Sequence, residues 1–295
     1  EFRRVLFRSD VFMVEKLLGV IGGSGLYSMD ELNVIEKVSL DTPFGPPSED
    51  VVIGELNGTR MAFLPRHGIG HFIPPSEINF RANIFAMKKL GVEQIISISA
   101  VGSMKEKLQP GHFSIPHQFI DRTTRRISTF FTTGMVGHVA LADPVCLATA
   151  EVLSAAAHKV NAIVHDGGTY VCIEGPQFST RAESNVYRQW DVDVIGMTNA
   201  TEAKLAREAS ICYATLALVT DYDCWKEEEE PVTVEAVLDI MHKNVETAQK
   251  ILKKLASNFK DKRSCDCGSA TENSVVTDSK RIPAQLKDKL STLIG

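Results

Sequence analysis

The sequence predicts an α/β protein with a central mixed, partly parallel β-sheet flanked by helices, built as a single domain. Short apolar runs alternate with longer helical patterns along most of the chain, which is typical of a sheet covered by helices. Several of these runs end in glycine or small polar residues, as strands do where they enter loops. The clearest helix covers residues 233–257, whose apolar side chains recur at spacings of three and four.

The strands follow in order. Residues 17–21 form a buried strand that ends in the tight loop Gly22-Gly23-Ser24-Gly25. Residues 51–56 and 61–65 flank Asn57-Gly58, a pair that suits the positive φ of a hairpin turn. Further strands are expected at residues 94–100, 171–174, 192–197 and 214–220.

A helix is expected over residues 76–90, with Ser76 as its N-cap and Gly91 just beyond its C-terminus. Residues 260–280 are polar and rich in Ser, Asp, Gly and Thr, so we expect a loop or mobile connector there. The other expected helices cover residues 144–158, 181–190, 200–210, 233–257 and 283–294. No internal repeat or domain break is evident.

Composition excludes two classes of protein. The 295 residues carry a net charge of −5, whereas a general nucleic-acid binder needs a basic surface. No apolar run reaches the roughly 18 residues that span a bilayer. Residues 1–12 are basic with scattered apolar residues, and we interpret them as a non-native leader before Met13, a transit peptide being the alternative. The domain is therefore expected to cover residues 13–295.

The six cysteines are expected to be reduced thiols, as in an intracellular, cytoplasmic protein. Cys265 and Cys267 form a Cys-x-Cys pair, which is weak evidence for zinc because no second cysteine or histidine pair lies nearby in the sequence. We therefore expect no metal, with a redox or metal role as the alternative.

Two loops carry groups that suit an anion. In Gly22-Gly23-Ser24-Gly25, backbone N–H groups and the Ser24 hydroxyl can approach an anion, although a plain tight turn is the alternative. The glycine pattern does not fit a dinucleotide-binding loop, which argues against a nicotinamide oxidoreductase. Arg66 and His67 follow an expected strand and form a compact cationic pair suited to phosphate, unless the loop is only solvated.

Other candidate residues lie at expected strand ends, the usual ligand-binding edge of such sheets. Ser99-Ala100 and Met197-Thr198 stand at two of these ends. Asp221 and Asp223 stand at a third, where buried carboxylates need partners and can recognise donors on a heterocycle; a polar cap over the sheet is the alternative. Phe178-Ser179 can stack on and bond to a planar base, although an ordinary core Phe is the commoner explanation of Phe178 alone.

Taken together, these segments resemble the 5′-methylthioadenosine phosphorylase family, within the trimeric purine nucleoside phosphorylases. The family order and rough spacing are kept from Leu18 to about Ala256. The Cys-x-Cys tail is similar to that of some bacterial and archaeal members. The matching stretches are residues 19–26, 41–47, 66–71, 97–103, 118–124, 173–183, 193–198 and 211–226.

The resemblance implies the nucleoside phosphorylase fold, a homotrimer and a set of site residues. Phosphate would be bound by Ser24, Arg66, His67, Ser99, Ala100 and Thr198. Met197 would hold the ribose hydroxyls through its main chain, and Phe178, Ser179, Asp221 and Asp223 would surround adenine. His71, His138, Val234, Val237 and Leu238 would line the 5′ end, where another subunit can contribute.

The sequence departs from the family at three places. Ser24 and Ser99 stand where many members have Thr, which preserves the hydroxyl. After Thr198 the chain reads Asn-Ala-Thr-Glu in place of the Asn-Leu-Pro-Glu of bacterial relatives. Ala200 and Thr201 are expected to loosen the start of that helix without abolishing activity.

The resemblance implies phosphorolysis of 5′-methylthioadenosine to adenine and 5-methylthioribose 1-phosphate, with phosphate as co-substrate and no metal or organic cofactor. A protonated Asp221 would act as general acid toward the purine, since burial and Asp223 raise its pKa. The main rival is a 6-oxopurine phosphorylase acting on methylthioinosine, inosine or guanosine. Asp221 argues against it because those enzymes typically have Asn there, and Ser179 stands where they carry Glu. A non-catalytic nucleoside-binding protein is a remote alternative.

Overall fold

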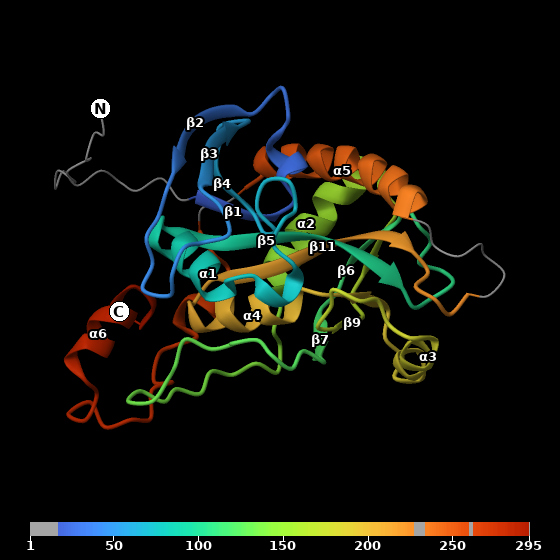
Figure 1. Ribbon diagram of the computed structural model, residues 1–295. Coiled ribbons are helices and arrows are strands. Elements are labelled where there is room, and N and C mark those ends of the chain that lie inside the picture. Colours follow the sequence, from blue (N-terminus) through green and yellow to red (C-terminus); the bar gives the residue numbers. More distant parts are fainter. Residues whose placement is uncertain (1–16, 227–233, 260–261, 295) are drawn as a thin grey trace.

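The computed structural model describes residues 17–226, 234–259 and 262–294 (Figure 1). Within these ranges, the side chains of Ser24, residues 234–238 and Ile294 are not described. The expected leader, residues 1–12, lies outside the described residues. None of the described helices has an apolar stretch long enough to cross a membrane.

A mixed sheet forms the centre of the described chain, as the sequence predicts. Neighbouring strands follow the order β2-β3-β4-β1-β5-β10-β9-β7. Strand β11 pairs with β5 and with β6, and β6 also pairs with β8. Strands β1, β4, β5 and β11 are mutually parallel where they pair, so their C-terminal ends meet at one edge. The strands are β1 (Leu17–Gly22), β2 (Asn33–Val38), β3 (Val51–Leu56), β4 (Thr59–Pro65), β5 (Val92–Ser103), β6 (Phe113–Ile115), β7 (Gln118–Asp121), β8 (Val164–Asp166), β9 (Thr169–Cys172), β10 (Val194–Gly196) and β11 (Cys212–Asp221).

Helices cover both faces of this sheet (Figure 1). One apolar core joins the sheet to α2 and α5, and a second joins its other face to α1, α4 and α6. α3 lies near the end of the sheet at which β11 ends (Figure 1). The helices are α1 (Phe80–Lys89), α2 (Leu147–Lys159), α3 (Arg181–Gln189), α4 (Asn199–Glu208), α5 (Val234–Ala256) and α6 (Ala284–Ile294), with short 3₁₀ turns η1 (Ser24–Tyr27), η2 (Pro75–Glu77) and η3 (Asp266–Ser269).

The hairpin of β3 and β4 confirms the Asn-Gly signal, because Asn57 and Gly58 both have positive φ, at 51° and 79°. The expected N-cap of the first helix is wrong. Asn79, not Ser76, caps α1, and its side chain accepts a hydrogen bond from the Ala82 N–H. Gly91 follows the helix with a φ of +85°, as expected.

Four strands were not predicted, namely β2, β6, β7 and β8. Three of them have only three or four residues, too few to show a period, and β2 is exposed along most of its length. The connector also has more structure than expected. Its described part contains η3, and a backbone bridge joins Val275 to Gly137.

Candidate active site

Asp221 ends β11 beside β5, and both oxygens of its carboxyl group accept hydrogen bonds. Thr220 Oγ1 donates to Oδ2 at 2.7 Å, and the Asp223 N–H donates to Oδ1 at 2.8 Å. Burial raises the pKa of Asp221, and the nearby charge of Asp223 raises it further, outweighing these two hydrogen bonds. Asp221 therefore keeps a proton to a higher pH than an ordinary aspartate.

The neighbouring strand leaves room for this carboxyl group. Gly102 of β5 pairs with Asp221, and a Cβ at Gly102 would lie 2.9 Å from Asp221 Oδ1. Two residues earlier on the same strand, Ala100 is exposed, and Ser99 donates to the adjacent Ala100 carbonyl at 3.3 Å. Of the small residues predicted at this strand end, Ala100 is therefore exposed, whereas Ser99 is buried.

A second acidic group joins this strand end to the segment before α3. Ser179 Oγ donates to both carboxylate oxygens of Asp223, at 3.3 and 3.2 Å. Phe178 is 78% exposed, so the alternative that it is an ordinary core residue is wrong. An aromatic side chain this exposed is free to stack on a planar ligand.

Arg66 lies almost fully buried where β4 and β1 end. Its N–H donates to the Gly22 carbonyl at 2.8 Å, which ties these strand ends together. Its guanidinium pairs with both carboxylate oxygens of Glu202 in α4, through Nε and, at 3.0 Å, through Nη2. It also donates to Ser97 Oγ at 2.6 Å and to the Ile98 carbonyl at 3.0 Å. The guanidinium is thus held in one orientation beneath β5.

Further buried hydrogen bonds connect this ion pair to Thr198. Asn199 Nδ2 donates to Ser97 Oγ, Tyr213 OH and Thr215 Oγ1, at 3.0, 3.0 and 2.7 Å. Thr198 Oγ1 donates to Asn199 Oδ1 at 3.1 Å. The structure therefore joins two of the residues expected to bind phosphate, Arg66 and Thr198, through side chains that the sequence did not single out.

His67 differs from the sequence expectation of a cationic pair. Burial and the neighbouring charge of Arg66 lower the pKa of His67 to about 4, so its ring is neutral at pH 7. Nδ1 lies 2.9 Å from the Ile73 carbonyl, which assigns the ring hydrogen to Nδ1 and leaves Nε2 as an acceptor. His71 stacks on this ring with the centroids 4.1 Å apart. Of the expected pair, only Arg66 carries charge at neutral pH.

Arg126 holds the main chain at Met197 and was missed by the sequence analysis. Its guanidinium donates to the carbonyl of Met197 and to that of Glu174, the latter at 2.6 Å, and pairs with Glu174 Oε1 at 3.0 Å. The N–H groups of Thr124 and Arg125 donate to Glu174 Oε2 at 2.6 and 3.1 Å. Arg126 is one of several arginines close together in the sequence, and no pattern distinguished it from the others.

Among the remaining expected residues, the structure describes the side chain of His138 but not those of Ser24, Val234, Val237 and Leu238. His138 is exposed beside the C-terminal segment, where its N–H donates to the Ser274 carbonyl at 2.9 Å. Ser24 begins η1 and α5 begins at Val234, but their side chains lie outside the described part of the structure. The same holds for Val237 and Leu238, so these positions stay predictions.

This arrangement offers two kinds of chemistry at one sheet edge. A carboxyl group with a raised pKa can donate a proton to a ligand. A fixed guanidinium, backbone groups and hydroxyls can hold an anion. Such a combination suits a reaction in which an anion attacks while a base departs.

Comparison with known proteins gives consistent matches. Residues 17–257 match the model of the phosphorylase superfamily. The S-methyl-5′-thioadenosine phosphorylase of Geobacter sulfurreducens is 54% identical over 283 residues, covering 96% of this chain and 99% of that protein. The protein of the same name from Thermofilum pendens is 48% identical, covering 88% of this chain and 98% of its own length.

Solved structures agree. A methylthioadenosine phosphorylase from an antarctic soil metagenomic library superposes with a TM-score of 0.91 at 48% identity, covering 95% of this chain and all of that one. Methylthioadenosine phosphorylase from Schistosoma mansoni in complex with adenine gives a TM-score of 0.83 at 36% identity, covering 88% of this chain and 99% of that one.

Proposed function

This chain belongs to the phosphorylase superfamily, and from that premise we propose that it is an enzyme of purine and methionine salvage, a pentosyltransferase. It cleaves 5′-methylthioadenosine with inorganic phosphate into adenine and 5-methylthioribose 1-phosphate. The relatives of that name, from bacteria and archaea, match nearly the full described chain. The single observation that carries the proposal is the Asp221 carboxyl group, buried with a raised pKa beside a strand of small residues.

Asp221 is the general acid of the proposed reaction. A phosphate oxygen forms a bond to C1′ of the ribose as the C1′–N9 bond breaks, and the electron pair of that bond moves to the purine. Asp221 gives its proton to N7 and so neutralises the departing base. Phe178 stacks on the base, while Ser179 and Asp223 hydrogen-bond at its edge. Met197 holds the ribose hydroxyls through its main chain.

Phosphate lies against Ser24, Arg66, His67, Ser99, Ala100 and Thr198 in this proposal. Arg66 Nη1 donates to the Ile98 carbonyl, and its second N–H has no partner among the described residues. That N–H is the donor we assign to phosphate. Glu202 offsets much of the guanidinium charge, so backbone groups and hydroxyls supply much of the binding. Neutral His67 accepts a hydrogen bond from monoprotonated phosphate through Nε2.

The 5′-methylthio group is proposed to lie among His71, His138, Val234, Val237 and Leu238. Because His138 lies beside Ser274 in its own chain, we assign its contribution to the pocket of a neighbouring subunit in a homotrimer. Light scattering combined with size-exclusion chromatography tests the assembly. A stable, fully active monomer would refute it.

The reaction needs no organic cofactor and no metal at the catalytic residues, because phosphate itself is the nucleophile. Nucleic acid and membranes are not proposed as partners. We also propose a cytoplasmic location, since none of the six cysteines, all of them described, belongs to a disulfide, as is usual in a reducing compartment.

One assay separates the proposal from its rivals. Release of free base is measured with 5′-methylthioadenosine, adenosine, methylthioinosine and inosine, each with and without phosphate. We expect phosphate-dependent turnover that is fastest with 5′-methylthioadenosine. A preference for either 6-oxo substrate would establish an oxopurine phosphorylase, and saturable binding without turnover would establish a nucleoside-binding protein.

A further inference from the structure

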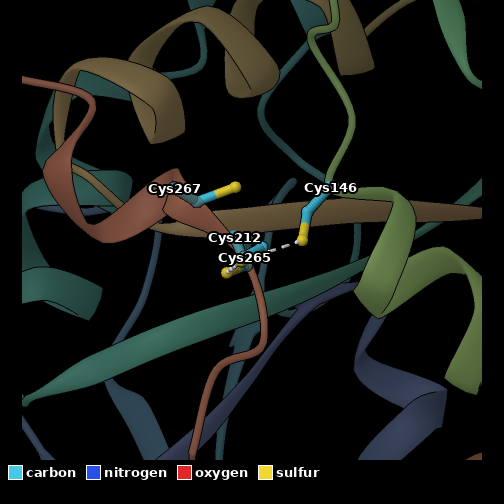
Figure 2. Close-up of side chains that lie close together, drawn as sticks. All are labelled: Cys146, Cys212, Cys265 and Cys267. Carbon is cyan, nitrogen blue, oxygen red and sulfur yellow. Dashed lines mark hydrogen bonds between the residues drawn. The ribbon is translucent and has the colours of Figure 1, made fainter.

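Four cysteines converge on one point of the fold, at the opposite end of β11 from Asp221 (Figure 2). The Sγ atoms of Cys146, Cys212, Cys265 and Cys267 all lie within 4.8 Å of one another. Cys265 Sγ lies 3.5 Å from Cys146 Sγ and 3.4 Å from Cys212 Sγ. All but Cys265, which is partly exposed, are buried. We call these residues the four-cysteine cluster.

Three separate elements build the cluster. Cys146 directly precedes α2, Cys212 begins β11, and the Cys-x-Cys pair lies at η3 in the C-terminal segment. The Cys146 N–H donates to the Tyr213 carbonyl at 2.9 Å, which joins the start of α2 to β11.

The C-terminal segment is anchored on both sides of the Cys-x-Cys pair at one residue, Ser210. Arg263 Nη1 donates to the Ser210 carbonyl at 2.8 Å, and Thr271 Oγ1 lies 2.9 Å from Ser210 Oγ. Arg263 also pairs with Glu93 at 3.3 Å. The convergence of the sulfurs therefore rests on contacts outside the cluster.

The sulfur positions suit a shared ion better than a bonded pair. A tetrahedral Zn²⁺ site with Zn–S bonds of about 2.3 Å separates its sulfurs by about 3.8 Å. Cys265 Sγ is almost equally far from two sulfurs, whereas a disulfide would bring one partner to about 2 Å and leave the other aside. Tetrahedral four-sulfur sets select zinc among the divalent metals available to proteins.

The surroundings favour thiolates. Cys146 lies at the N-terminus of α2, where the helix dipole stabilises negative charge, and Thr149 Oγ1 donates to its Sγ at 3.3 Å. Each thiol loses its proton to solvent as it binds the metal.

An open surface hollow of about 470 Å³ gives the cluster an entry path. Its walls include three of the four cysteines, together with Arg207 and the carboxylates Glu151 and Asp266. Carboxylates at such a mouth attract a cation. Four thiolates with one Zn²⁺ carry a net charge of −2, which Arg207 on the wall of the same hollow is placed to offset in part.

We propose that the four-cysteine cluster is a structural zinc site that fastens the C-terminal segment to the start of α2 and to β11. Four protein ligands fill the tetrahedron, so no position is open for catalysis. The site is independent of the proposed phosphorolysis. The sequence alone predicts reduced thiols without metal. It does not reveal Cys146 and Cys212 as a second cysteine pair, because they lie 119 and 53 residues from Cys265.

The test measures zinc in the full chain purified with a non-thiol reductant. We expect about one zinc per chain by mass spectrometry of metals, and about six free thiols after unfolding in a chelator without reductant. Cobalt exchanged into the site should give thiolate charge-transfer bands and the ligand-field absorption of a tetrahedral ion. Chelation should lower the melting temperature of the wild type.

Matched variants locate the metal. The double variant Cys265→Ser with Cys267→Ser should lose the zinc, whereas Cys172→Ala, at a buried cysteine outside the cluster, should keep it. If circular dichroism shows that the double variant does not fold, Cys146→Ser takes its place as the variant expected to lose zinc. Equal zinc in wild type and in a folded cluster variant, iron in place of zinc, or only two to four titratable thiols would each overturn the proposal.

Discussion

Arg66 and Glu202 form a two-point ion pair between the end of β4 and the first turns of α4, with side chains only 3% and 1% exposed. Burying two charges is costly, and their mutual attraction offsets that cost only while both are present. The pair therefore makes the expected phosphate site depend on a residue that touches no expected ligand. Glu202 is a positioning residue in this sense.

Glu202→Gln should destabilise the fold by about 3–5 kcal/mol, because it leaves the Arg66 charge buried without a partner. The KM for phosphate should rise more than the KM for nucleoside, since the guanidinium loses its fixed orientation. Urea denaturation and steady-state kinetics measure the two effects. Glu208→Gln is the matched control: Glu208 is buried on the same helix, and its hydrogen bonds within the described ranges come from Thr129 and the Phe130 N–H. Equal losses in the two variants would show that the charge pairing is unimportant.

His67 should make the fold less stable in acid. Its pKa is about 4 in the folded chain and about 6.5 when unfolded, so the unfolded chain takes up a proton first as the pH falls. Stability contributed by neutral His67 is therefore present above pH 6.5 and is lost as the pH falls from 6.5 toward 4. Between pH 7 and pH 5 the loss is on the order of 2 kcal/mol.

His67→Gln should remove that part of the pH dependence, measured as the free energy of unfolding in urea at successive pH values. His138→Gln, at an exposed histidine, provides the comparison. A wild-type and a His67→Gln profile that run parallel over this range would contradict the assignment of a buried neutral ring.

The sequence predicts much of this fold because its signals are local. The Asn57-Gly58 turn, the glycine after α1 and the long amphipathic pattern of α5 each depend on a few neighbouring residues, and each is confirmed. Strand ends with small or acidic residues, such as Ser99 and Asp221, were likewise identifiable from their neighbours, and these two lie on adjacent paired strands in the structure.

What the sequence could not supply are pairings between distant residues. Arg66 and Glu202 are 136 positions apart, and Arg126 reaches Met197 across 71. Neither partner has a pattern that points to the other. The charge of His67 was misjudged for the same reason, because burial beside Arg66 is a property of the packed structure. The four-cysteine cluster likewise depends on packing between remote segments.

Thr201 is one of the two residues at the start of α4 that depart from the family sequence, and its effect on stability can be tested. Its side chain is fully buried, and its hydroxyl has no hydrogen-bond partner within the described structure. An unpaired buried polar group costs about 1–3 kcal/mol, so Thr201→Val, which keeps the shape, should raise the free energy of unfolding by about 1 kcal/mol. Thr215→Val is the control, because that hydroxyl accepts from Asn199 and its removal should be destabilising. Destabilisation by Thr201→Val would show that the hydroxyl has a partner.

Asp221→Asn should change both the pH dependence and the base preference of the enzyme. Because its pKa is raised, wild-type Asp221 holds its proton at low pH and loses it as the pH rises, so kcat should fall along that limb. Asn cannot titrate, so the variant should have lower turnover of 5′-methylthioadenosine without that limb.

Base preference is the sharper readout, because the hydrogen-bond pattern at position 6 differs between the two purine classes. A protonated Asp221 uses its O–H at N7, so its other oxygen presents only an acceptor to the 6-amino group, whereas the amide of Asn can turn a donor toward a 6-oxo group. A polar site deprived of its matching group loses several powers of ten in discrimination, so Asp221→Asn should move kcat/KM toward methylthioinosine and inosine. Asp223→Asn, whose amide oxygen can still accept from Ser179, should leave the base preference unchanged.

In wild type, adenosine should be used roughly 10–200-fold less well than 5′-methylthioadenosine, since an apolar pocket discriminates by only about 1–3 kcal/mol. If wild type already prefers a 6-oxo substrate to its 6-amino counterpart, Asp221 does not select adenine, and the oxopurine reading replaces the one proposed.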